Sequence, residues 1–315
     1  MNTHDTEATK ASPRIAVLGS LYMDWVMQVP QLPAPGGVAQ ANRLQQVPGG
    51  KGLRLALACT RQGAAVQMFG SVGRDSAGHM LRMALQQAGV DVAHVQVQDG
   101  MATGASLQLC EGQEAPRTVL LPCANTKVEL PMHSFVAALT GSEYLLVSSE
   151  LPQALAERAV QMAHAAGCRV ALQASVHMDI PAHWWPQLQL LVIDAEQAGQ
   201  YTGLAVQDAD SALRAARLLL AQGVPQVVLS WCGQGALALD ASGYSIHPCL
   251  FGPLADSPAV ADAFMGALLA RMAEGSDLGS AVSWGLAAAS LTQPWGAMPQ
   301  FHEVQALLGP SQMYA

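Results

Sequence analysis

The chain has 315 residues, which is enough for one large α/β domain or two smaller ones. Apolar residues make up 51% of the chain and charged residues 12%, so a large buried core is expected and long disorder is not. The net charge is −8 and no basic run occurs, which disfavours a nucleic-acid partner, because binding DNA or RNA requires a positive surface.

The two ends of the chain are predicted to be tails. Residues 1–12 are polar and lack the apolar core of a signal peptide, so we predict disorder there. Residues 13–309 are predicted to form one α/β domain, followed by a second tail at 310–315. No apolar run reaches the ~18 residues of a membrane span. The six cysteines form no CxxC pair, so we expect free thiols in a cytoplasmic protein.

Short apolar runs alternate with helical patterns through the first two thirds of the chain. Apolar runs bounded by Gly, Pro or polar residues are typical of the buried strands of a parallel sheet. The alternation predicts βαβ crossovers and a doubly wound, mostly parallel sheet flanked by helices. The predicted strands are 15–19, 66–71, 144–148, 169–174, 188–194 and 226–230, and the predicted helices are about 51–62, 75–89, 152–167 and 209–222.

Two stretches interrupt this alternation. Residues 26–48 contain four prolines and a Gly-Gly pair, and residues 103–121 contain short alternating runs around a turn at 111–114. These stretches can pair as a small β-sheet standing off the main domain, with lid segments at about 22–48 and 100–122. A lid over an active site and an ordinary surface excursion both fit the spacing.

The last third of the chain is predicted to contain a hairpin and two helices. Residues 236–240 and 244–249 flank the turn-like segment Ala-Ser-Gly at 241–243. Helices at about 259–273 and 277–292 follow it.

Asp262 lies in the first turn of the predicted helix 259–273. The first N–H groups of a helix have no partner within the helix and, together with the helix dipole, they attract anions. A carboxylate here could accept a proton from a substrate hydroxyl while the N–H groups of 259–262 stabilise phosphoryl charge. The alternative is that Asp262 only improves the electrostatics of the helix N-terminus.

Three glycines and one of the three lysines meet in Gly49-Gly50-Lys51-Gly52. Glycines let the backbone approach a ligand closely, although the same residues also fit a simple strand-to-helix turn. The segment is not the GxxxxGK[ST] phosphate loop. The first strand does not lead into GxGxxG, which argues against a dinucleotide-binding oxidoreductase.

Two further carboxylates follow predicted strands. Asp24 comes soon after the first strand, and Glu150 follows the strand 144–148. Ligands of open α/β sheets bind at this edge. Either residue can be a helix cap or a solvated surface group, but with Asp262 they could accept hydrogen bonds from sugar hydroxyls.

In their order and spacing these pieces resemble the ribokinase-like (PfkB) family of sugar and nucleoside kinases. The resemblance covers about residues 14–309. It rests on Gly19-Ser-Leu-Tyr-Met-Asp24, Gly49-Gly-Lys-Gly52, Val72-Gly-Arg-Asp-Ser-Ala-Gly78, Ala124-Asn125, Glu150-Leu-Pro152, the strand end at Asp194, and the segments 230–235 and 256–266.

The resemblance implies a role for each matching residue. It implies ATP and Mg²⁺ as cofactors, K⁺ in potassium-dependent members, and a β lid that supports a homodimer. The implied catalytic group is Asp262 as base, with Ala261 and Val260 in the anion hole; the implied sugar contacts are Asp24, Gly49, Gly50, Lys51 and Glu150; the implied ATP contacts are Asp194, Ser230, Gly233 and Gly235; and the implied cation site is Asp256 with Pro258.

The nucleotide site departs from the family's pattern at three places. Ala261 replaces a glycine, and its methyl group crowds the place expected for the γ-phosphoryl group. Cys232 replaces the glycine that usually follows the position of Ser230. The family's N-x-x-E element is present as Asp194-Ala-Glu-Gln197, with Glu196 offset by one residue.

The sugar pocket departs from the pattern as well. Tyr22 and Arg54 occupy places where ribose-binding members often carry asparagine. A nucleoside could stack on Tyr22, and a sugar acid or sugar phosphate could pair with Arg54. Alternatively, both side chains point elsewhere.

The sequence therefore predicts an ATP-dependent phosphotransferase acting on a primary hydroxyl of a sugar, a sugar derivative or a nucleoside. It predicts no nucleic-acid or membrane partner. Because Ala261, Cys232 and Gln197 alter the nucleotide site, the alternative is a catalytically weakened kinase fold that binds sugar or nucleotide in a regulatory role.

Overall fold

The computed structural model describes most of the chain. The described residues are 12–112, 116–175, 178–231, 233–249, 252–255, 257–293 and 297–309. Of the two predicted tails, only Ser12 is among these residues. Cys232 and Asp256 also lie outside the described ranges.

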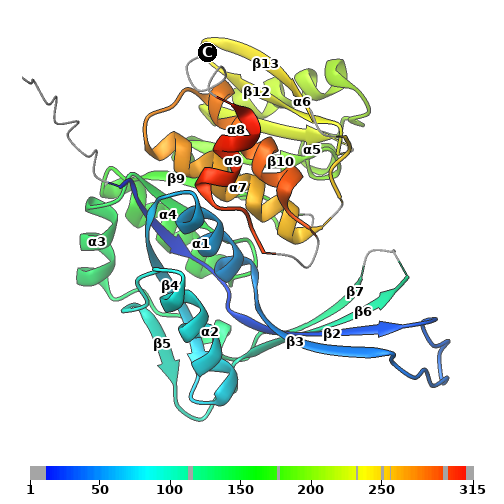
Figure 1. Cartoon of the computed structure of the whole chain (residues 1–315). Helices are drawn as coiled ribbons and strands as arrows, with labels where there is room; N and C mark the ends of the chain where they lie inside the picture. The colour runs from blue at the N-terminus through cyan, green and yellow to red at the C-terminus, as the bar shows by residue number, and fades with distance from the viewer. Residues whose placement is uncertain are drawn as a thin grey trace, which may run out of the picture.

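The central sheet consists of nine strands, β1 (Arg14–Leu18), β4 (Ala65–Gly73), β5 (Val95–Gln98), β8 (Tyr144–Val147), β9 (Arg169–Gln173), β10 (Leu190–Asp194), β11 (Gln226–Trp231), β12 (Gly235–Asp240) and β13 (Gly243–Pro248). Their order is β13-β12-β11-β10-β9-β8-β1-β4-β5 (Figure 1). The neighbours from β5 to β11 pair in parallel, and β12 and β13 add antiparallel. The prediction of a mostly parallel α/β sheet is confirmed.

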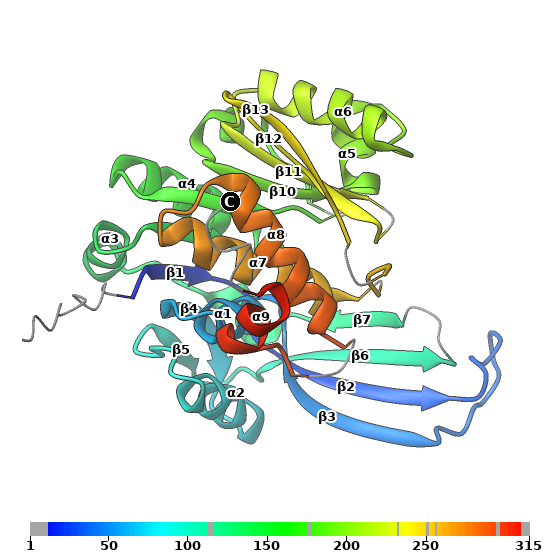
Figure 2. The same cartoon turned by 45° about the horizontal axis from the view of Figure 1, so that its top comes forward.

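Helices cover both faces of this sheet (Figure 2). One face carries α1 (Lys51–Arg61), α2 (Ser76–Gln87), α7 (Pro258–Ala273) and α8 (Leu278–Leu291), with α9 (Phe301–Leu308) packed on α8. The other face carries α3 (Met132–Thr140), α4 (Gln153–Ala165), α5 (Ala195–Thr202) and α6 (Ala209–Ala221). The doubly wound arrangement is therefore present as predicted.

Side-chain alternation in the strands produces a separate core on each face. In β1, Ile15 and Val17 join the core beneath α1 and α7, whereas Ala16 and Leu18 join the core beneath α4 and α6. All four are fully buried. Because successive side chains of a strand point to opposite faces, a strand buried on both sides must be apolar throughout.

A second sheet of four strands projects from the main domain (Figures 1 and 2). It consists of β2 (Tyr22–Val29), β3 (Arg43–Gly49), β6 (Gly104–Glu111) and β7 (Arg117–Leu121), in the order β3-β2-β6-β7. The two irregular stretches of the sequence therefore pair as predicted. The turn predicted at 111–114 lies partly outside the described residues.

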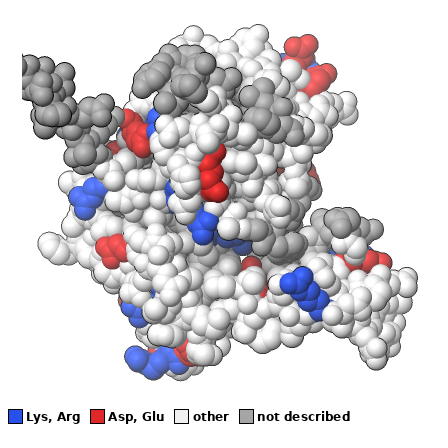
Figure 3. Space-filling view, viewed as in Figure 1, with Lys and Arg blue, Asp and Glu red and all other residues white. Residues whose placement is uncertain are grey.

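Charged side chains are sparse on the face of the molecule shown in Figure 3. On the face shown in Figure 3, acidic and basic side chains are scattered and form no extended basic patch. No helix in the described ranges is both long and apolar enough to cross a membrane.

Helices α1 and α7 pack against each other unusually closely at Gly266. A Cβ atom on Gly266 would lie 2.2 Å from the Cβ of Ala58 and 2.8 Å from the backbone nitrogen of Cys59. Any larger side chain would force the helices apart. Since α1 carries Lys51 and α7 carries Asp262, this contact sets the distance between two predicted site residues.

Replacing Gly266 with Ala should therefore destabilise the protein. Overpacking of this kind typically costs ~1–3 kcal/mol, and the free energy of unfolding in urea measures it. Gly141→Ala is the matched control, because the atom nearest to its new Cβ, at 3.3 Å, is the flexible end of Arg14. An equal loss of stability in both variants would contradict the importance of this helix contact.

Candidate active site

Polar side chains gather at the carboxyl ends of four adjacent parallel strands. Glu150 follows β8, Gln173 ends β9 and Asp194 ends β10, while Ser230 in β11 pairs in register with Asp194. This edge is where open α/β sheets bind their ligands. Glu150, Asp194 and Ser230 were predicted site residues, and the structure places them along one edge.

The glycine segment leads from β3 into α1 beside Asp24. A Cβ on Gly49 would lie 2.0 Å from Oδ2 of Asp24, so glycine is needed there to make room for the carboxylate. Gly50 precedes α1 with a φ of +90°, a conformation that side chains other than glycine rarely adopt. The segment thus brings the start of α1 close to β2.

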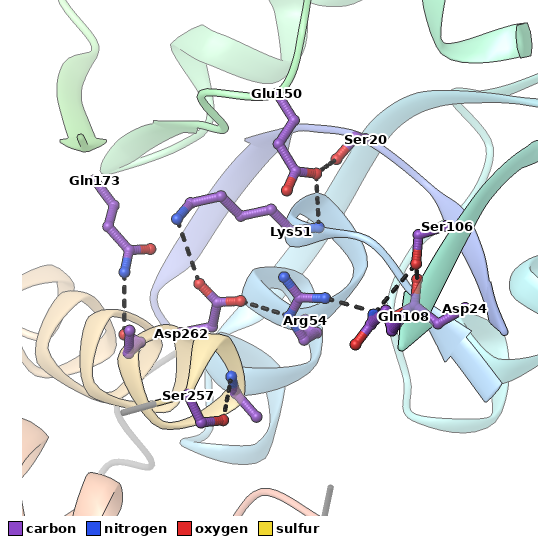
Figure 4. Close-up of polar contacts among 12 residues, drawn as sticks. Ser20, Asp24, Lys51, Arg54, Ser106, Gln108, Glu150, Gln173, Ser257 and Asp262 are labelled. Carbon is purple, nitrogen blue, oxygen red and sulfur yellow. Dashed lines mark hydrogen bonds and ion pairs between the residues drawn. The ribbon is translucent and has the colours of Figure 1, made fainter. Parts of the chain in front are cut away.

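Asp262 lies between two cations from α1 (Figure 4). Its side chain is 1% exposed, and Nε of Arg54 donates a hydrogen bond of 2.6 Å to its Oδ2. Nζ of Lys51 lies 3.6 Å from its Oδ1, which accepts no hydrogen bond within the described ranges. The predicted base and two predicted substrate-binding residues therefore meet.

Arg54 also approaches Asp24, the buried carboxylate of β2. The distance from NH1 of Arg54 to Oδ2 of Asp24 is 3.8 Å. Oδ1 of Asp24 accepts a 2.6 Å hydrogen bond from Ser106, whose Oγ accepts one from Gln108. Burial acts to lower the pKa of Arg54, but the charge of Asp262, followed by those of Glu150 and Asp24, outweighs this and raises it.

Glu150 holds the N-terminus of α1. Its Oε2 accepts hydrogen bonds from Oγ of Ser20 and, at 3.2 Å, from the backbone N–H of Lys51. The residue preceding α1, Gly50, has no side chain to cap the helix. A carboxylate at this point satisfies a free N–H group and interacts favourably with the helix dipole.

Tyr22 is buried beside the same carboxylates. Its ring and hydroxyl are 1% exposed, and burial, followed by the charge of Glu150, raises the pKa of its hydroxyl. A nucleobase can stack only on an aromatic ring whose face is accessible. The role of Tyr22 as a stacking platform for a nucleoside is therefore wrong in this conformation, and the residue instead packs under the site.

The start of α7 is held by a cap and by a neighbouring strand. Oγ of Ser257 accepts a hydrogen bond from Ala259 N–H at 3.2 Å, and the carbonyl of Ser257 accepts one from Ala261 N–H at 3.1 Å. Gln173 donates to the carbonyl of Ala261 at 3.2 Å. Two of the N–H groups predicted for the anion hole, those of Ala259 and Ala261, are thus already paired. Val260 is buried, whereas the side chain of Ala261 is exposed. Pro258 is the first residue of the helix, so Asp262, at the fifth position, lies just past the first turn and not within it as predicted.

The predicted nucleotide residues have clear structural partners. Asp194 caps α5 through a reciprocal pair of hydrogen bonds with Gln197. Gly233 has a φ of +62°, and its carbonyl accepts a hydrogen bond from Leu254 N–H at 2.9 Å. Gly235 pairs with Pro248, and a Cβ on it would lie 2.4 Å from the carbonyl oxygen of residue 247. Gly233 thus allows a tight turn before β12, and Gly235 allows the close approach of β13.

A cavity of about 630 Å³ lies beside this turn, between the β12–β13 hairpin and α8. Pro248 lines it at the end next to Gly235, and Asp262 and Lys51 do not line it. In its wall, the ring nitrogens of His247 lie 2.7 Å from Oγ of Ser245 and 2.9 Å from Oγ of Ser283. Burial lowers the pKa of His247, although the charge of Asp277 acts in the opposite direction.

Three residues that build the site were given no role by the sequence reasoning. Gln173 ends a correctly predicted strand, and Ser20 lies inside a segment that carried the resemblance, so position was the only signal for either. Asn125 accepts a hydrogen bond from Leu21 N–H at 2.8 Å and donates one to its carbonyl at 2.9 Å. It thereby fixes the connection from β1 to β2.

Comparison with protein families identifies one match. The family model described as pfkB family carbohydrate kinase matches residues 12–293. This range includes both sheets and all the predicted site residues.

Two curated relatives are similar over most of their length. The chain is 28% identical to the ribokinase of Haemophilus influenzae over 280 residues, covering 88% of this chain and 91% of that protein. It is 26% identical to the ribokinase of Bacillus subtilis over 302 residues, covering 93% and 99%.

Solved structures share the fold. The ribokinase of Arabidopsis thaliana complexed with ribose and ATP has a TM-score of 0.86 at 22% identity, covering 95% of this chain and 100% of that one. A putative ribokinase II from E. coli in complex with ATP and Mg²⁺ has a TM-score of 0.78 at 17% identity, covering 94% and 99%.

Asp24 should make the stability of the protein depend on pH. Burial raises its pKa above the ordinary 3.8, although Ser106 and Arg54 act against this. A carboxyl group whose pKa is higher in the folded state than in the unfolded state makes the protein less stable as pH rises from the unfolded pKa through the folded pKa. The non-titrating D24N variant should therefore gain stability relative to wild type as pH rises from about 4 upwards.

The free energy of unfolding in urea, measured for both proteins across this range, gives the comparison. A difference that moves in favour of wild type as pH rises would mean that Arg54 and Ser106 stabilise the charged form more than burial disfavours it.

Proposed function

We propose that this chain, which belongs to the pfkB family of carbohydrate kinases, transfers phosphate from ATP to a primary hydroxyl of a sugar, a sugar derivative or a nucleoside. The observation that carries the proposal is the position of Asp262. It is a buried carboxylate just after the first turn of α7, with two cations beside it and one oxygen that accepts no hydrogen bond from the described residues.

Asp262 can act as the general base. Its Oδ1 is free to accept a hydrogen bond from the substrate hydroxyl and then the proton, as the hydroxyl oxygen attacks phosphorus. Its Oδ2 is held by Arg54, which fixes the direction of the carboxylate. Lys51 is placed to interact with the attacking oxygen and the transferred group, and Asp24 and Glu150 are placed to bind further hydroxyls.

The nucleotide is proposed to lie along the ends of β10 and β11, against Asp194, Ser230, Gly233 and Gly235. The neighbouring cavity of about 630 Å³ offers space for the adenosine part, within the usual size of small-molecule sites. When bound, ATP supplies the phosphoryl group and Mg²⁺ neutralises its charge. The N-terminus of α7, with Val260 and Ala261, faces the anionic end.

The residues present are compatible with Mg²⁺ carried by the nucleotide. The described part of the chain holds no group of three or more His, Cys, Asp or Glu side chains placed to bind a metal. Mg²⁺ in kinase sites is held mainly by phosphates and water, with one or two carboxylates. Glu196, exposed in the first turn of α5, is a candidate for such a carboxylate. A K⁺ site would involve Pro258 and Asp256.

A weakened kinase fold in a regulatory role remains the second candidate function. It is favoured by the exposed methyl group of Ala261 and by the paired N–H groups at the start of α7. Both reduce the room and the free donors available to a phosphoryl group. Binding of sugar and nucleotide would survive this change, whereas transfer would not.

The small sheet is proposed to act as a lid and as a homodimer surface. One of its faces carries Asp24 and Ser106 towards the active site. On the other face, Trp25, Leu107 and Val119 lie in register across β2, β6 and β7. Val119 is 59% exposed and Leu44 on β3 is 55% exposed. A second copy of the same sheet, also apolar, would cover this face.

Replacing Asp262 with Asn should reduce phosphoryl transfer by ~10²–10⁴-fold, because the loss of a general base has this typical effect. Single-turnover transfer from ATP over a panel of sugars and nucleosides measures it. Asp99→Asn is the matched control, since Asp99 is exposed and pairs with Arg74 away from the site. It should retain wild-type rates.

If the wild type and D262N show the same background ATP hydrolysis and no transfer, the kinase proposal is wrong. Calorimetry with ATP, ADP and the sugars then decides what remains. Tight binding without turnover would favour the regulatory role.

Replacing Val119 with Glu should convert a dimer of this protein into a monomer, because a charge would be buried at the centre of the proposed contact. Sedimentation velocity measures the change. Leu218→Glu, on the exposed face of α6, is the control and should leave the dimer intact. A wild-type protein that is monomeric at all concentrations would contradict the proposal.

A further inference from the structure

Arg54 reaches across the substrate side of the site with most of its hydrogen-bonding capacity unused. Its side chain is 20% exposed, and Nε donates to Asp262. The shortest approach of its NH1 to Asp24 is 3.8 Å, beyond hydrogen-bonding distance. Within the described ranges, neither NH1 nor NH2 donates a hydrogen bond, so the outer edge of the guanidinium is free (Figure 4).

Lys51 adds a second cation with free donors to the same space. Its side chain is 13% exposed, and Nζ stands 3.6 Å from Oδ1 of Asp262. Among the residues that the structure describes, Nζ donates no hydrogen bond. Two mostly buried cations therefore face one carboxylate with N–H groups left over. Both side chains keep some exposure, so a ligand that enters the site can bind these donors in place of water.

The three carboxylates around these cations do not use up the free donors. Oε2 of Glu150 is bound to Ser20 and to the N-terminus of α1, and Oδ1 of Asp24 is bound to Ser106. Within the described ranges, Asp262 accepts one hydrogen bond, from Nε of Arg54, and its Oδ1 is left for the substrate hydroxyl. The outer N–H groups of Arg54 and Nζ of Lys51 are thus left to bind acceptor atoms of a ligand.

We propose that the substrate carries, besides the hydroxyl that is phosphorylated, a carboxylate or phosphate group that binds the outer edge of Arg54. This inference rests on the proposed kinase function and names its substrate class. A neutral sugar brings one donor with each hydroxyl acceptor, whereas a carboxylate or phosphate brings acceptors only. Its paired oxygens match the planar guanidinium, which binds them through two parallel hydrogen bonds.

Arg54 is therefore a specificity-determining residue of the site. Because its Nε is hydrogen-bonded to Asp262, Arg54 holds the anionic group of the substrate at a fixed distance from the proposed base. A substrate anchored in this way presents a hydroxyl to Oδ1, the free oxygen of Asp262. A neutral sugar leaves the outer N–H groups of Arg54 unpaired and is bound less tightly.

The test compares matched substrates that share a free primary hydroxyl. One set is D-ribose, D-ribonate and D-ribose 1-phosphate, and the other is D-glucose, D-gluconate and D-glucose 1-phosphate. The kcat/KM for phosphoryl transfer is measured for wild type and R54Q. In at least one set, wild type should prefer an anion over the neutral sugar by about tenfold or more, as expected for a charge-assisted pair. The carboxylate and phosphate arms show which anion the site takes.

In R54Q this preference should disappear, mainly through loss of activity on the anion. R54K keeps the charge but not the planar fork, so it should fall between the two proteins. Arg74→Gln, which removes an exposed arginine away from the site, should behave as wild type. Calorimetric binding of the anions to each protein provides a second measurement that does not require turnover.

The outcomes separate this inference from the kinase proposal. Equal use of neutral and anionic sugars by wild type, or an unchanged preference in R54Q, overturns the inference and leaves the kinase standing. Arg54-dependent binding of an anion without any transfer supports the inference and counts against the kinase. Absence of both transfer and anion binding in the two sets overturns the inference as well.

Discussion

A buried carboxylate paired with two cations from another helix is the interaction on which this site depends. Asp262 is almost fully buried, and an isolated charge at such depth is very costly. Arg54 and Lys51 offset that cost, and both come from α1, about two hundred residues earlier in the chain. The pairing can form only when the first and last parts of the domain are packed together. A folded domain is therefore a precondition for this charge pairing.

The surrounding elements each hold one member of this arrangement in place. Gly266 brings α7 close to α1, and Glu150 attaches the start of α1 to the end of β8. Gln173, at the end of β9, holds the first turn of α7. Because these contacts join parallel strands to two helices, the site is fixed by the main sheet, while the small sheet contributes Asp24 from the side. A shift of either helix changes the charge pairing directly.

The sequence was sufficient for the architecture and for the main polar residues, but not for their pairing. Apolar runs and their spacing predicted the parallel strands, because burial on both faces demands continuous apolar sequence. Short helices such as α3 and α5 gave too few turns for a periodic signal. The sequence marked Arg54 as unusual, but it could not reveal the hydrogen bond to Asp262, because the two residues are far apart in the chain. Burial of Tyr22 depends in the same way on the pairing of β2 with β6, which periodicity does not reveal.

The position of Ala261 shows which part of the nucleotide site the sequence change affects. The residue has no left-handed backbone conformation, its N–H group is bonded within the helix, and Gln173 holds its carbonyl. Alanine is therefore fully compatible with the backbone of this helix, and only its exposed methyl group is new. In the proposed site, the replacement takes space from an incoming phosphoryl group without altering the cap, Asp262 or the cations. Under the proposed function, Asp262 keeps the contacts that a base needs, so the room at residue 261 would decide between phosphoryl transfer and binding alone.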